Sequence, residues 1–136
     1  MKITTYIIRF LLAVLFSLHG VEKLFTSASP DKFAAAGMHA DFVEFYELLE
    51  RTGYLAFVGA LQLLCALLLL FARTYVLASV MLIPLILCLI ASHVFMSHNV
   101  GYVLFDTAIL VINLFLLYPE WPTLKETFLK PQSKWI

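Results

Sequence analysis

The sequence predicts an all-α membrane protein, an antiparallel up-down four-helix transmembrane bundle with an additional amphipathic helix in the first, outer connection. Four apolar stretches carry this prediction, at residues 6–25, 53–71, 75–96 and 100–118. Each has about the 20 residues that a helix needs to cross a hydrocarbon core about 30 Å thick. Hydrophobic residues make up 62% of the chain and charged residues only 13%, whereas soluble domains carry about 25% charged residues. We therefore expect one four-span membrane domain over residues 1–136.

The first stretch has a basic flank, Lys2 and Arg9, but no small-residue cleavage site follows it. It is therefore expected to be an uncleaved signal-anchor. Arg9 lies about a turn inside the span, and its long side chain is expected to extend to the inner headgroups.

The first connection predicts an amphipathic segment at about residues 30–50. Ser29-Pro30-Asp31 is a favourable helix start, with a capping hydroxyl followed by proline at the first helical position, and Gly37 is expected to interrupt it. Apolar side chains then recur with helical spacing at Phe42, Phe45, Tyr46 and Leu49. Acidic residues occupy the other faces, which disfavours binding to anionic lipid, so we expect this helix to cap the bundle.

The later connections are only a few residues long, at 72–74 and 97–99, so the spans that they join should be antiparallel neighbours. Cys65 and Cys88 fall at different depths of their spans, which disfavours a disulfide, and both are expected to be buried. Asn113 is expected to form a hydrogen bond between helices. A C-terminal tail, 119–136, contains two Trp residues suited to the membrane interface.

The distribution of Lys and Arg favours cytoplasmic termini in a bacterial cytoplasmic (inner) membrane, because basic residues prefer the cytoplasmic side. The side of the termini carries six basic residues, Lys2, Arg9, Arg73, Lys125, Lys130 and Lys134. The other side carries three, Lys23, Lys32 and Arg51. The formal net charge of zero gives no electrostatic footprint for a nucleic-acid partner.

Polar residues concentrate in the outer half of the predicted bundle, with one or more on each span. The candidate binding residues are His19, Glu22, Lys23, Gln62, His93 and Asp106. An ionisable side chain at membrane depth is costly unless it is paired or faces a polar cavity. These residues are therefore expected either to line one polar pocket or to form a structural hydrogen-bond network.

An apolar pocket with imidazole, carboxylate and ammonium groups suits the oxygen atoms of a quinone, with His or Asp exchanging protons. Two histidines on different helices are also compatible with axial haem ligation, which we consider weaker. His19, His93 and Asp106 barely supply the three ligands of a zinc site. We therefore predict no metal site and no intrinsic cofactor.

These residues lie in motifs that resemble the DoxX family of small four-span bacterial membrane proteins. The first span has Arg9 and ends in His19-Gly20-Val21-Glu22-Lys23-Leu24-Phe25, similar to the family's Gly-x-x-Lys-Leu-Phe ending. The second has Gly59-Ala60-Leu61-Gln62 and ends near Arg73, and the third has Pro84 and His93-Val94-Phe95. The resemblance implies the four-span fold and a loose link to quinone or redox chemistry. Gln62 departs from the family, which usually has Glu there.

The resulting functional prediction is a quinone-pocket or redox-associated subunit, with membrane lipid, quinone and other membrane or redox subunits as partners. The chain has no cofactor motif, so electrons would come from a partner. A non-catalytic structural subunit or assembly factor is the alternative, and a small transporter is a minor one. No catalytic residue is assigned, and enzymatic activity is left open.

Overall fold

The protein is helical throughout the part that the computed structural model describes, residues 2–26 and 30–129. This agrees with the all-α class that the sequence predicts. In chain order the elements are α1 (Lys2–Phe25), α2 (Pro30–Ala35), α3 (Ala40–Arg51), α4 (Tyr54–Leu70), α5 (Tyr75–Ser92), the π-helix η1 (His93–Ser97), α6 (Val100–Leu117), the 3-10 helix η2 (Tyr118–Glu120) and α7 (Trp121–Phe128). The predicted cap Ser29 and the tail residues Lys130, Lys134 and Trp135 lie outside the described residues.

Within the described residues, three segments are long and apolar enough to cross a membrane, Ile3–Phe25, Tyr75–Ser97 and Val100–Phe128. A fourth crossing is obtained if α3 and α4, which meet at a bend of 83°, are counted together. Gly53 forms this bend with a left-handed φ of 78°, a conformation that glycine adopts without steric cost. Gly37, which separates α2 from α3, has a φ of 72°.

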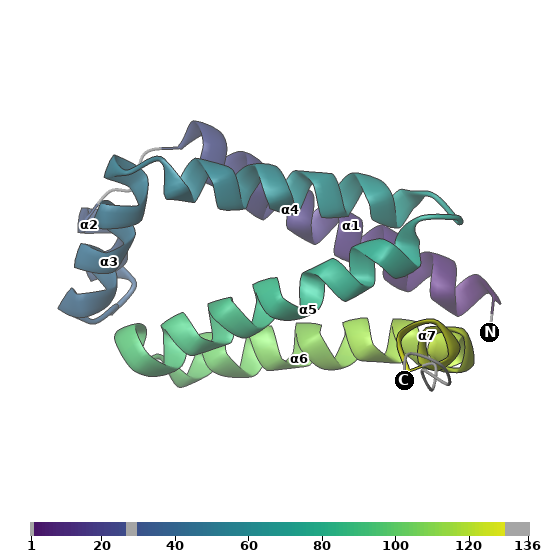
Figure 1. Ribbon diagram of the computed structural model, residues 1–136. Coiled ribbons are helices and arrows are strands. Elements are labelled where there is room, and N and C mark those ends of the chain that lie inside the picture. The colour runs from purple at the N-terminus through teal and green to yellow at the C-terminus, as the bar shows by residue number, and fades with distance from the viewer. Residues whose placement is uncertain (1, 27–29, 130–136) are drawn as a thin grey trace, which may run out of the picture.

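The helices form two pairs (Figure 1), α1 with α4 and α5 with α6. The α4 and α5 ends joined by the short turn lie together, and the two helices diverge toward the opposite end, where α2 and α3 lie. The start of α1 and helix α7 lie at the same end of the molecule. The two pairs and α3 together line one cavity.

Two glycines allow α1 and α4 to pack closely. A Cβ atom added to Gly20 would lie 2.9 Å from the carbonyl oxygen of Gly59, and one added to Gly59 would lie 2.9 Å from the carbonyl oxygen of Gly20. Real Cβ atoms do not approach backbone so closely. Small residues at such crossings increase van der Waals contact between membrane helices.

Arg9 is buried, so the prediction that it extends to the headgroups is wrong. Its Nε donates to the carbonyl oxygen of Leu69 and its Nη2 to that of Leu70, both at 2.8 Å. The last carbonyls of α4 have no partner within the helix, and a cation there also compensates the helix dipole. The guanidinium additionally lies over the rings of Tyr6 and Tyr75, 5.2 and 4.7 Å from their centroids.

Polar and sulfur-containing side chains complete the packing between helices. Asn113 on α6 donates from Nδ2 to the carbonyl oxygen of Ser79 on α5 at 2.9 Å, as predicted. Both cysteines are free thiols, and Cys65 is buried in the core. Cys88 is exposed, which corrects the prediction that it is buried, because it lines a cavity.

Replacing Gly59 with Val should lower the thermal midpoint of the protein in detergent, because the new side chain meets the α1 backbone. Overpacking of this kind costs about 1–3 kcal/mol. The matched control is Ala60→Val, which adds volume at an exposed position of α4. Equal midpoints for the two variants would contradict the close crossing.

Replacing Arg9 with Met should also lower the thermal midpoint, because two charge-assisted hydrogen bonds, each with a net contribution of about 1.5–3 kcal/mol, are lost. Arg9→Lys should recover only part of the loss, because the lysine ammonium keeps the charge but lacks the rigid fork of donors that lets arginine reach both carbonyls. Arg73→Met, at an exposed position in the turn after α4, is the control and should change little. A midpoint in Arg9→Met as high as in the control would show that the carbonyl contacts do not stabilise the fold.

Candidate functional site

A cavity of about 670 Å³ lies between the two helix pairs, with α3 at one end. Apolar side chains of α3, α4 and α5 form most of its wall. Five of the six candidate residues also line it, namely His19, Glu22, Lys23, His93 and Asp106. The structure thus brings together residues from α1, η1 and α6.

Gln62 is the sixth candidate, and it does not line this cavity. The α4 wall is formed instead by Tyr54, Leu55, Phe57, Val58 and Leu61. Gln62 is fully buried, and neither its Nε2 nor its Oε1 has a hydrogen-bond partner among the described residues. It is therefore separate from the cluster of charged groups.

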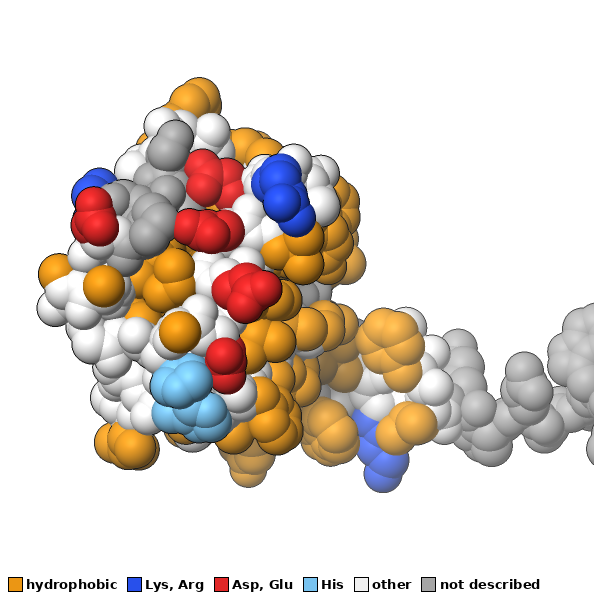
Figure 2. Space-filling model, turned by 90° about the vertical axis from the view of Figure 1, so that its left-hand side faces the viewer, with side chains coloured by type: hydrophobic (Ala, Val, Ile, Leu, Met, Phe, Trp, Pro, Cys, Tyr) orange, Lys and Arg blue, Asp and Glu red, His pale blue; other side chains and the backbone are white. Residues whose placement is uncertain are grey.

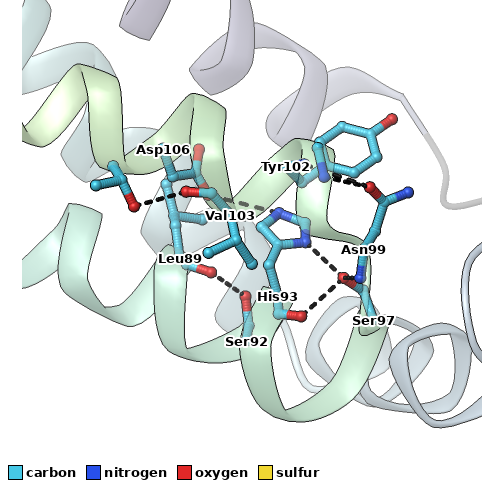
Figure 3. Close-up of polar contacts among 10 residues, drawn as sticks. Leu89, Ser92, His93, Ser97, Asn99, Tyr102, Val103 and Asp106 are labelled. Carbon is cyan, nitrogen blue, oxygen red and sulfur yellow. Dashed lines mark hydrogen bonds and ion pairs between the residues drawn. The ribbon is translucent and has the colours of Figure 1, made fainter.

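His93 is held by the π-helix η1 (Figure 3), whose wider turn shifts the side chains relative to a continued α-helix. The Ser97 hydroxyl donates to the His93 carbonyl oxygen at 3.1 Å and accepts from His93 Nδ1 at 3.0 Å. This pattern places a proton on Nδ1. The other nitrogen, Nε2, is then the acceptor of the neutral ring.

Two aromatic rings enclose the imidazole of His93. Phe42 of α3 stacks on it with the centroids 5.2 Å apart, and Tyr102 of α6 stacks on it at 5.0 Å. The sequence suggested neither contact, because the three residues come from separate elements. The stack fixes the plane of the imidazole ring.

Asp106, on α6, faces His93, on η1. Its Oδ2 is 3.7 Å from His93 Nε2, a distance for an ion pair rather than a hydrogen bond. This oxygen is buried and has no hydrogen-bond partner among the described residues. The pair is therefore placed to hold one exchangeable proton, on either residue.

His19 and Lys23 reach the cavity from the end of α1, one helical turn apart on the same face. His19 Nδ1 is 2.9 Å from the carbonyl oxygen of Leu15, and because a carbonyl only accepts, Nδ1 carries the proton. Both His19 and Lys23 interact electrostatically with Asp106. Glu22 is exposed beside Lys23 and interacts with it electrostatically.

Helix α3 closes one end of the cavity with its aromatic face. Phe33 of α2 packs edge-on against Phe42 and Tyr46, with centroids 5.7 and 4.8 Å apart. Burial raises the pKa of Tyr46 to about 12, assisted by Glu22 and Glu50, so its hydroxyl stays protonated at neutral pH. The opposite face is acidic (Figure 2), with Asp41, Glu44 and Glu47 exposed.

The structure also shows a contact between two exposed histidines that the sequence did not suggest. His39 at the start of α3 packs edge-on against His98, with centroids 5.3 Å apart. His98 has a left-handed φ of 51°, and Asn99 after it caps α6 through the amides of Gly101 and Tyr102. In the described part of the chain, no three or more His, Cys, Asp or Glu residues are arranged to hold a metal ion.

The comparisons with known proteins agree with the helical membrane architecture. The family model described as DoxX matches residues 4–98, more than half of the chain. Comparisons with curated proteins and with solved structures gave no match. The match covers α1 to η1 and includes every candidate residue except Asp106. Together with its long apolar helices, it makes this chain a multi-pass membrane protein that belongs to the DoxX family.

Proposed function

We propose that the protein crosses the bacterial cytoplasmic (inner) membrane four times in an up-down bundle, with both termini cytoplasmic. In this topology α4 is the second span, and its 17 residues extend about 26 Å at 1.5 Å per residue. Helix α3 then caps the outer end of the bundle rather than completing a span. The arrangement is supported by two basic residues near the turn after α4, where Arg9 contacts the last carbonyls of that helix and Arg73 lies in the turn itself. This turn is at the end of the molecule where α1 begins, whereas the acidic helix α3 is at the opposite end (Figure 1).

We further propose that the cavity binds a quinone and that the protein is a redox-associated subunit. The observation that carries this proposal is that His19, Lys23, His93 and Asp106, which interact electrostatically, all line a cavity that is otherwise largely apolar. A largely apolar pocket with a few convergent polar groups is the usual form of a small-molecule site. Its volume of about 670 Å³ falls within the usual range for such sites, about 300–1,000 Å³.

In this proposal the polar groups have separate roles. Lys23 donates hydrogen bonds to a quinone oxygen, with Glu22 balancing its charge. Reduction of a quinone to a quinol takes up two electrons and two protons, so Lys23 gives one proton to the oxygen that it holds, and the His93–Asp106 pair gives the second proton to the other oxygen. The electrons come from a partner membrane or redox subunit, because the residues of the cavity supply proton donors and acceptors only.

A structural accessory subunit is the second candidate function. It is favoured by Arg9 and Asn113, which are buried polar residues that act only in packing between helices. In that case the cavity cluster also stabilises the bundle and binds no ligand. The transporter alternative has no comparable observation in its favour.

The test is the Kd of a short-chain benzoquinone for the protein in phospholipid nanodiscs. We expect His93→Phe, which keeps an aromatic ring for stacking but removes both nitrogens, to weaken binding at least about tenfold, or about 1.4 kcal/mol. Asp106→Asn should weaken binding similarly, because it removes the charge but keeps the shape.

Glu47→Gln is the matched control, because Glu47 is exposed on α3 and does not line the cavity. It should bind the quinone with the wild-type Kd. If the wild type does not bind and both cavity variants unfold at lower temperature, the structural role is correct. Mass spectrometry of small molecules that co-purify from native membranes should independently show a quinone on the wild type and less on His93→Phe.

A further inference from the structure

A small hollow lies beside the main cavity, between α1, α5 and α6. Its volume is about 20 Å³, and apolar side chains form most of its wall. Among the described residues, two polar ones line it, His19 and Asp106, and both also line the main cavity. A buried water needs about 10–15 Å³ and two to four polar partners. The hollow meets both requirements.

The two polar residues each have an unused hydrogen-bonding atom. Asp106 Oδ2 is buried without a hydrogen-bond partner among the described residues, and a buried carboxylate oxygen in that state is costly. His19 uses Nδ1 on the Leu15 carbonyl oxygen, which leaves Nε2 as the acceptor nitrogen of its neutral ring. A water in the hollow has two hydrogens, which suits two acceptors.

We propose that one water occupies this hollow and donates hydrogen bonds to Asp106 Oδ2 and His19 Nε2. The water joins His19 and Asp106, and through the 3.7 Å contact between Asp106 Oδ2 and His93 Nε2 it also joins His93. The result is a proton-exchange chain from α1 to η1. The site does not depend on which ligand the main cavity takes.

Proton transfer along this chain is balanced at each step. When His19 is protonated, its Nε2 proton passes to the water oxygen, and the water gives one of its own hydrogens to Asp106 Oδ2. The water is regenerated, and Asp106 passes the proton to His93 Nε2 when their contact shortens from 3.7 Å to hydrogen-bond distance. No bond other than N–H and O–H is formed or broken.

Other charged and titratable groups surround the chain. Lys23 on α1 interacts electrostatically with both Asp106 and His93, and Glu22 interacts with Lys23. From α3, Tyr46 lines the cavity as a neutral hydroxyl. Because these charges act on the proton-exchange chain, Lys23 and Glu22 are kept unchanged in every variant used to test it.

The test is nuclear magnetic resonance of ¹⁵N-histidine-labelled protein in nanodiscs without any quinone, so that its outcome is independent of quinone binding. The chain has four histidines, and each signal is assigned by a single His→Gln variant. We expect magnetisation transfer from a bound water to the His19 ring in the wild type. Asp106→Asn should change the ring-nitrogen chemical shifts of both His19 and His93. Asp41→Asn is the control, because Asp41 lies 3.3 Å from His39, and it should shift His39 but neither of the other two.

A second variant fills the hollow without changing any charge. Ile109 lines it, so Ile109→Phe should abolish the water transfer to His19, whereas Ile112→Phe on the exposed face of α6 should preserve it. If wild-type His19 shows no contact with a bound water, the proposal is wrong. It is equally wrong if Asp106→Asn shifts His93 and leaves His19 unchanged.

Discussion

The backbone contact between Gly20 and Gly59 is the constraint on which the rest of the architecture depends. Because α1 and α4 approach each other closely at glycine, they form one tightly packed pair. Helix α5 diverges from this pair toward α3 (Figure 1). The divergence creates the cavity, and the same contact places His19 and Lys23 beside it. Arg9 secures the far end of the pair through the last carbonyls of α4. The site is thus a direct consequence of the packing of α1 against α4, because Gly20 follows His19 in the chain and Gly59 lies against Lys23.

The charged and titratable groups of the site come from α1, η1 and α6, and a local irregularity brings His93 and Asp106 together. The π-helix η1 ends the third long apolar segment and turns His93 toward Asp106. Ser97, within η1, fixes the tautomer of that imidazole. A regular α-helix through residues 93–97 would present different atoms to α6. The chemistry proposed for the cavity therefore depends on five residues that contribute almost nothing to the apolar core.

Sequence reasoning was most successful where one physical effect dominates. Apolar length predicted the long helices, and helical periodicity indicated the segment that became α3, with Phe42 buried against His93. The position of each polar residue along its predicted span indicated that five of the candidate residues lie near one another, because residues at equal depth on packed helices tend to meet. It failed for Gln62, since depth gives no information about which side of a helix faces the cavity. The prediction for Arg9 was wrong because its partners are backbone carbonyls. Every residue has a backbone carbonyl, so the sequence does not indicate which ones a buried arginine will contact.

The aromatic stack of Phe42, His93 and Tyr102 has an evolutionary consequence. The stack links α3, η1 and α6 through the faces of the rings. A change in ring size at one position therefore alters the space available to the other two rings. Selection should therefore act on these three positions as a group rather than singly. A lineage that replaces the imidazole with another side chain should also substitute positions 42 and 102. The packing of α3 against the bundle would then change as well.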